Sequence, residues 1–179
     1  MYCVRILAVA LALTHAGAHA AGAHEHGAAT LHVVVEGDRL HLSFASPLDN
    51  LVGFERAPRN DKEKAAVKSA VERLRAPERL FVPTSEARCT RTSVDLDSPV
   101  IDPALLAKTG KAAPSKSGGG HASIEAEIAF RCEQPKALSG IEVKAFEAFR
   151  GLKRIDVQVA AANKQAGAKL TPKNARISW

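Results

Sequence analysis

Two short alternating segments on either side of one tight turn constrain the fold of this chain more than any other feature. Gly37 and Asp38 form the centre, and large apolar residues occupy every second position around them: Leu31, Val33, Val35, Leu40, Leu42 and Phe44. Such alternation with a two-residue Gly-Asp loop is typical of an antiparallel hairpin. The turn fixes the register by pairing Glu36 with Arg39, and all six apolar side chains then share one face. Val34 is the large apolar residue on the other face. The hairpin is therefore expected to bury the face that carries the six apolar side chains and to expose the other.

The same register places two histidines on the outer face of the hairpin. His32 lies opposite Ser43 and His41 opposite Val34, so the histidines are diagonal neighbours with Cβ atoms about 7 Å apart. Such a pair can share a metal ion, because imidazole nitrogens bind Zn²⁺, Cu²⁺ and Ni²⁺. Two exposed strand histidines without a metal give the same pattern, and the sequence leaves both interpretations open.

The N-terminus has the three parts of a secretory signal peptide. Arg5 precedes an apolar run at residues 6–13, and the small-residue triplet Ala18-His19-Ala20 follows as a cleavage site. The apolar run is too short to span a bilayer, which needs about 20 residues, and no later segment comes closer. We therefore predict cleavage after residue 20, export, and no transmembrane segment in the mature chain.

Export changes how the cysteines are interpreted. Cys3 is removed with the signal peptide, which leaves Cys89 and Cys132 as an even pair in an oxidising compartment. We expect a disulfide between them, and closing a loop of this length would stabilise the fold by about 4 kcal/mol in the chain-entropy description. Two free thiols that bind metal are the alternative, although neither cysteine lies in a CxxC motif.

One clear helix follows the hairpin. Asn60 can cap its N-terminus, Pro77 ends it, and one apolar stripe runs along it through Val67, Ala70, Val71 and Leu74. These signals predict a helix over residues 61–75. Residues 46–58, bounded by prolines, have no clear period and predict an ordered loop or a short turn of helix.

The second half of the chain predicts further strands and one short helix. Period-two alternation at residues 123–132 indicates a strand that buries Cys132. Shorter strands are expected at 80–82, 88–96, 155–159, 168–171 and 175–179. Phe146, Phe149 and Leu152, at spacings of three, favour a short helix over residues 145–152. Residues 109–120 are rich in Lys, Ala, Ser, Pro and Gly and predict a flexible excursion.

These elements predict an α+β fold with a mostly antiparallel sheet, one clear helix, one short helix and a single disulfide. Residues 1–20 would be the signal peptide, 21–30 a flexible His-containing N-terminus, and 31–179 one domain with the excursion at 109–120. The formal net charge of +6 is scattered along the chain rather than gathered in a stripe, so we expect no nucleic-acid binding. It favours contact with an anionic membrane face or an acidic partner.

Histidines near the mature N-terminus are the main candidates for chemistry. His24 and His26 are separated by one residue, and in an extended chain they project to the same side. They can chelate one ion, with Glu25, water, His121 or another chain completing a zinc site. Histidines that are incidental to a disordered tail are the alternative.

The predicted metal ligands are therefore His24, His26 and His121, followed by His32 and His41. Zinc is the expected ion, and copper or nickel is the alternative. A chain processed to begin Gly22-Ala23-His24 would suit square-planar Cu²⁺ or Ni²⁺.

No catalytic constellation is visible in the sequence. The chain has no GxSxG or HExxH motif, and Gly118-Gly119-Gly120 precedes a strand where a phosphate-binding loop needs a helix. Glu125 and Glu127 are spaced as outward strand residues rather than as an acid/base pair. We therefore do not expect an enzyme.

Three segments carry a resemblance to a known family: His24-Glu25-His26-Gly27, the stretch from Asn50-Leu51-Val52-Gly53-Phe54 to Pro58, and the strand ending in Phe130-Arg131-Cys132. On these residues the chain resembles the ZrgA-type periplasmic proteins, which are zinc-regulated accessories of zinc uptake. The resemblance covers almost all of the mature chain. It implies zinc binding in the periplasm of a Gram-negative bacterium, alongside an ABC-type zinc importer and its solute-binding protein.

Two departures from the family pattern reduce the expected zinc capacity. Many members carry a long His/Asp-rich run in the central excursion, whereas residues 108–120 contain no histidine here. The pattern also commonly has histidine where this chain has Arg56. A function of a different class is the alternative, namely a periplasmic interaction module that docks a partner through residues 48–58 and has no functional metal site.

Overall fold

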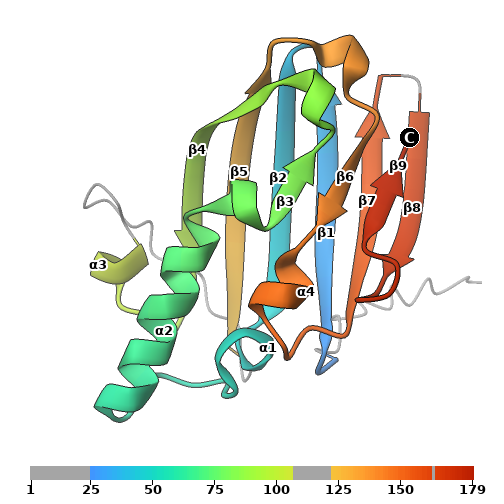
Figure 1. Ribbon diagram of the computed structural model, residues 1–179. Coiled ribbons are helices and arrows are strands. Elements are labelled where there is room, and N and C mark those ends of the chain that lie inside the picture. Colours follow the sequence, from blue (N-terminus) through green and yellow to red (C-terminus); the bar gives the residue numbers. More distant parts are fainter. Residues whose placement is uncertain (1–24, 107–121, 163) are drawn as a thin grey trace, which may run out of the picture.

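The computed structural model describes residues 25–106, 122–162 and 164–179. Its main element is a six-stranded sheet with strand order β4-β5-β2-β1-β7-β8, and a three-stranded sheet has the order β3-β6-β9. The small sheet and the helices lie on one face of the large sheet (Figure 1). No described helix or strand covers the opposite face, which we call the outer face.

The large sheet consists of β1 (Ala28–Glu36), β2 (Arg39–Pro47), β4 (Cys89–Asp97), β5 (Ser123–Cys132), β7 (Arg154–Ala161) and β8 (Lys164–Leu170). The small sheet consists of β3 (Phe81–Pro83), β6 (Gly140–Val143) and β9 (Arg176–Ser178). The helices are α1 (Asp49–Val52), α2 (Asp61–Leu74), α3 (Pro103–Leu106) and α4 (Ala145–Ala148), with 3₁₀ turns at Pro77–Arg79, Ser85–Ala87 and Pro135–Ala137. Among the described strands, β1 and β7 pair in parallel and the other pairs are antiparallel. The predicted α+β class with a mostly antiparallel sheet is confirmed.

The β1–β2 hairpin has the predicted register. Glu36 pairs with Arg39 and His32 with Ser43, and Val34 is the large apolar side chain left exposed. β1 begins at Ala28, so residues 28–30 belong to the sheet although the sequence analysis put them in the N-terminal segment 21–30. The reason is that β7 pairs with β1 from Ala28 onward. This contact is long-range, and Ala28 and Ala29 give no local sequence signal for a strand.

The core lies between the inner face of the large sheet and the elements that cover it. Asn60 caps α2 by accepting a hydrogen bond from the Glu63 backbone N–H at 2.9 Å, as predicted, and the apolar stripe of α2 is buried. α4 ends at Ala148, earlier than the predicted residue 152, because Phe149 adopts an extended conformation. Gly151 then packs on α1 so closely that an added Cβ would lie 2.3 Å from the Asn50 carbonyl oxygen.

The predicted disulfide joins Cys89 and Cys132 at directly paired positions of β4 and β5. These cysteines are therefore not free metal-binding thiols. None of the described helices is both long enough and apolar enough to cross a membrane.

Removing the disulfide is expected to destabilise the domain. The cysteines are 43 residues apart in sequence, and a loop of that length corresponds to about 4 kcal/mol of chain entropy in the unfolded state. A Cys89→Ala/Cys132→Ala variant should lose several kcal/mol of unfolding free energy in urea titrations. Wild-type protein unfolded in reductant is the control, and it should match the variant; equal stability of variant and oxidised wild type would contradict the prediction.

Candidate metal centre

Residues Glu25 to Ala28 form a turn that leads into β1. The Ala28 backbone N–H donates to the Glu25 carbonyl oxygen at 3.0 Å, and Gly27 has φ +85°. Glycine suits this position because a positive φ is sterically costly for residues with a Cβ. The sequence analysis assumed an extended chain at His26, and that assumption is wrong: His26 lies inside the turn, so period-two geometry does not set the direction of its side chain.

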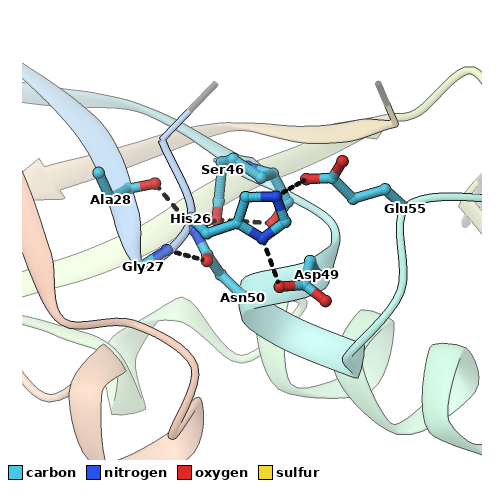
Figure 2. Close-up of polar contacts among 8 residues, drawn as sticks. His26, Gly27, Ala28, Ser46, Asp49, Asn50 and Glu55 are labelled. Atoms are coloured by element: carbon cyan, nitrogen blue, oxygen red, sulfur yellow. Dashed lines mark hydrogen bonds and ion pairs between the residues drawn. The ribbon is translucent and has the colours of Figure 1, made fainter. Parts of the chain in front are cut away.

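Asn50, buried in α1, holds this turn in place (Figure 2). Its Oδ1 accepts from the Gly27 backbone N–H at 2.6 Å, and its Nδ2 donates to the Ala28 carbonyl at 2.8 Å and to Ser46 Oγ at 3.1 Å. The Asn50 side chain thus satisfies the Gly27 N–H and the Ala28 carbonyl, and it links both to the end of β2. His26 is attached to a rigid part of the fold.

The His26 ring lies between two carboxylates that come from the segment after β2. Its Nδ1 donates to Asp49 Oδ2 at 2.9 Å, and its Nε2 lies 3.8 Å from Glu55 Oε1 (Figure 2). The His26 side chain is 66% exposed, whereas Glu55 is 14% exposed. The ring is therefore largely exposed to solvent, and each of its two nitrogens faces one carboxylate.

α1 and the residue after it bring the two carboxylates to the same ring. Asp49 is the first residue of this short helix, and Gly53 ends it in the left-handed region with φ +86°. Its backbone N–H donates to the Asp49 carbonyl oxygen at 2.8 Å. The chain turns back after this cap, and Glu55 consequently reaches the side of His26 opposite Asp49.

The carboxylates raise the pKa of His26 above its ordinary value of 6.5. The hydrogen bond to Asp49 is the main cause, and the charge of Glu55 is the second. Both groups favour the imidazolium because they are negatively charged neighbours of a cation. A metal ion that binds this ring therefore competes with a proton that is held more firmly than in a free histidine.

Glu25 is engaged elsewhere. Both of its carboxylate oxygens accept from the Arg154 guanidinium, at 3.0 and 2.8 Å, and this pair lowers the pKa of Glu25. Arg154 also donates through Nε to Asp156 at 3.1 Å. Glu25 was a candidate to complete the zinc site, but in the structure its oxygens bind Arg154 and the acidic donors beside His26 are Asp49 and Glu55.

The arrangement fits the first part of a zinc site. In zinc proteins the histidine nitrogen that does not bind metal usually donates to a carboxylate, which orients the ring, and Asp49 has that position. Tetrahedral zinc ligands lie about 3.4 Å apart, so the 3.8 Å between Nε2 and Glu55 Oε1 needs only a small adjustment. Within the described residues, no group of three or more His, Cys, Asp or Glu side chains is placed to hold a metal ion. His26 Nε2 and Glu55 Oε1 are thus two neighbouring potential donors.

The other predicted ligands are distributed differently. His32 and His41 are exposed on the outer face, with the diagonal register that the sequence predicts. Ser43, opposite His32, donates to Glu127 at 2.6 Å. His24 and His121 lie outside the described residues, as do the predicted signal peptide and the predicted excursion at 109–120. These four histidines remain predicted ligands.

Comparison with known families bears on the whole domain. A model of the ZrgA family, described as a zinc uptake protein family, matches residues 23–179. The chain belongs to the ZrgA family. A comparison with curated proteins found no match. Two of the three segments that carried the sequence resemblance, around His26 and around Asn50, meet at the candidate metal centre of this ZrgA-family domain.

Sequence reasoning missed Asp49 and Glu55 as site residues of this ZrgA-family member. They lie 23 and 29 positions after His26, in a segment without a regular period. A usable signal was present nevertheless, because Asp49 directly precedes the segment 50–58 that resembles the family and Glu55 lies within it. Two resembling segments with complementary donors indicate a shared site.

Replacing Asn50 should destabilise the domain and free the turn that carries His26. Asn50→Ala leaves the Gly27 N–H and the Ala28 carbonyl without their partner, which should cost about 2 to 4 kcal/mol of unfolding free energy. Chemical denaturation measures the loss. Asn174→Ala, at an exposed position, is the matched control and should change stability little; a similar small effect for both variants would contradict the assigned role of Asn50.

His26 should titrate above pH 6.5, and its interaction with Asp49 and Glu55 should stabilise the fold in acid rather than in base. Because the folded-state pKa is raised, this stabilisation is fully present below pH 6.5 and is lost as pH rises through the folded-state pKa. The stability difference between wild type and His26→Gln should therefore be larger at pH 5.5 than at pH 8.5, and NMR should report the raised pKa directly. Asp49→Asn should move that pKa downward, whereas an unchanged pKa would exclude Asp49 as its main cause.

Proposed function

We propose that this ZrgA-family protein is a periplasmic zinc-binding accessory that assists zinc acquisition by an ABC importer. Zinc is its cargo rather than a resident cofactor. In this proposal His26 Nε2 and Glu55 bind the ion and Asp49 is a positioning residue. The observation that supports it is the direction of the His26 ring, whose Nδ1 is held by Asp49 while Nε2 faces Glu55.

Incomplete coordination suits a protein that passes zinc on. Structural zinc sites are closed by four protein ligands, whereas a site with open positions exchanges its ion with water or with other ligands. His26 is largely exposed, so a second donor can approach the ion without unfolding of the domain. His24, two residues earlier in the chain, is the predicted third donor, and His121 is a further one.

His32 and His41 are proposed as a secondary pair. Their diagonal placement on β1 and β2 allows both rings to approach one ion on the outer face. In the described part of the chain, neither of these rings has a hydrogen bond to a carboxylate like the one between His26 and Asp49. We therefore expect it to bind zinc more weakly than the His26 and Glu55 site.

The compartment and the partners belong to the same proposal. The predicted signal peptide would export the chain, and the family's connection to zinc uptake supports a place beside a zinc importer or its solute-binding protein. We propose no catalytic activity. Copper and nickel remain alternative ions for the imidazole donors.

Zinc binding by calorimetry tests the proposal. Mature protein without a His-tag should bind zinc saturably, and His26→Ala and Glu55→Gln should each weaken that binding because each removes a direct donor. Asp49→Asn should weaken it by about 10- to 100-fold, the usual effect of losing the carboxylate that orients a metal-bound histidine. Combined His24→Ala/His26→Ala/His121→Ala replacement should abolish the tight site.

The matched control is His32→Ala/His41→Ala, which removes two histidines from a different surface and should leave the tight site intact. Lowering the pH should weaken binding through protonation of His26, and the raised pKa moves that loss to above pH 6.5. No binding by the wild-type protein, or binding unchanged between pH 7.5 and 5.5, would refute histidine-based zinc handling. Function would then have to be sought in the alternative, a protein-interaction module acting through residues 48–58.

A further inference from the structure

The two edge strands of the large sheet, β4 and β8, differ in the regularity of their pairing. At one edge, the pairing of β4 with β5 shifts between Arg91 and Ser93, and the Arg91 side chain turns away to pair with Glu78. At the other edge, β8 pairs with β7 without any shift, from Ile155–Leu170 to Ala161–Lys164. Bulges protect sheet edges from further pairing, so β4 is protected in a way that β8 is not.

The free side of β8 can accept another strand. An edge strand directs alternate backbone N–H and C=O groups away from the sheet. Within the described residues, residues 164–170 make no backbone hydrogen bond to any element except β7. The strand contains no proline and spans Lys164–Leu170. It is therefore a regular edge with unpaired backbone groups.

The side chains of β8 leave this edge accessible. Its centre is Ala166, Gly167 and Ala168, and Gly167 is exposed. At these three positions β8 itself has only small side chains beside the backbone. A Cβ added at Gly167 would meet only the Val157 carbonyl oxygen, at an ordinary contact distance of 3.6 Å.

We infer that β8 pairs antiparallel with β8 of a second copy of this chain, about a two-fold axis at Gly167. Gly167 then faces its own equivalent, and Ala166 faces Ala168 of the second copy. Both large sheets join into one continuous sheet across the axis. Because the interface is two-fold symmetric, one surface serves as both partners.

Self-complementarity of the sequence around Gly167 favours a second copy over an unrelated strand. In this register Lys169 faces Gln165 of the second copy, and Lys164 faces Leu170, so no lysine directly opposes a lysine. The two copies of Lys169 are four positions apart along the strands, about 14 Å, which exceeds the Debye length of about 8 Å at physiological salt. The lysines that often protect edge strands are thus placed where they do not oppose this pairing.

The same placement predicts a weak, concentration-dependent dimer. One strand pair with small side chains buries little apolar surface, and small interfaces give transient association. The inference does not rest on the zinc proposal, because β8 contains none of the proposed metal ligands.

Sedimentation velocity over a range of protein concentrations tests the inference. Wild-type protein should shift from monomer to dimer as concentration rises. Gly167→Lys places two ammonium groups opposite each other across the axis and should keep the protein monomeric throughout. Gln158→Lys is the matched control, since it adds the same charge to the same face one strand inward, opposite Gly167 on β7, and should dimerise like wild type.

A second variant keeps the test decisive if Gly167→Lys folds poorly. Gln165 is exposed, and Gln165→Lys would place a lysine opposite Lys169 of the second copy without touching the core. It should reduce association at least tenfold while the circular dichroism spectrum stays that of wild type. A wild-type protein that stays monomeric at every concentration would overturn the inference, and so would dimerisation of both edge variants at wild-type strength.

Discussion

The side-chain amide of Asn50 connects three parts of the chain at one end of the large sheet. It binds the Gly27 N–H, the Ala28 carbonyl and the Ser46 hydroxyl, so the start of β1, the end of β2 and α1 share one buried polar centre. A buried amide with these partners fixes geometry strongly, because any displacement leaves a polar group unsatisfied. Gly151 packs directly on the same residue, which adds the segment before β7 to this junction.

This junction explains how an exposed histidine can have a defined direction. His26 is one residue before Gly27, whose backbone is held by Asn50 and whose carbonyl oxygen accepts from the Lys153 and Arg154 backbone N–H groups. Asp49 is one residue before Asn50 and orients the ring. The proposed role as a zinc carrier would need ligands that are accessible to a partner yet already in place, since ordering a mobile side chain reduces affinity. The exposed His26 ring meets the first requirement, and the buried Asn50, which holds the backbone next to His26, meets the second.

The features that the sequence predicted depend on local patterns. Alternation and a two-residue turn specify the register of the β1–β2 hairpin, and a cap with an apolar stripe specifies α2. The Cys89–Cys132 pairing followed from counting the cysteines that remain if the predicted signal peptide is removed. The candidate metal centre combines residues from a turn, a short helix and a loop, and no period links them. Two of its features were therefore not predicted: His26 lies in a turn rather than in an extended segment, and its acidic neighbours are Asp49 and Glu55.

Arg56 occupies a position where the family resemblance leads us to expect histidine. Its guanidinium donates to both oxygens of Glu63 in α2, each at 2.8 Å, and lies 5.2 Å from the centre of the Phe54 ring. The same interaction, with the Arg59 backbone N–H, lowers the pKa of Glu63 to about 2. An imidazole cannot form this two-pronged contact, because its two nitrogens point in different directions. In place of the histidine that the resemblance leads us to expect, this chain therefore has an ion pair that fastens the segment following Glu55 to α2. This contact restricts the backbone next to Glu55, the carboxylate that faces His26 Nε2.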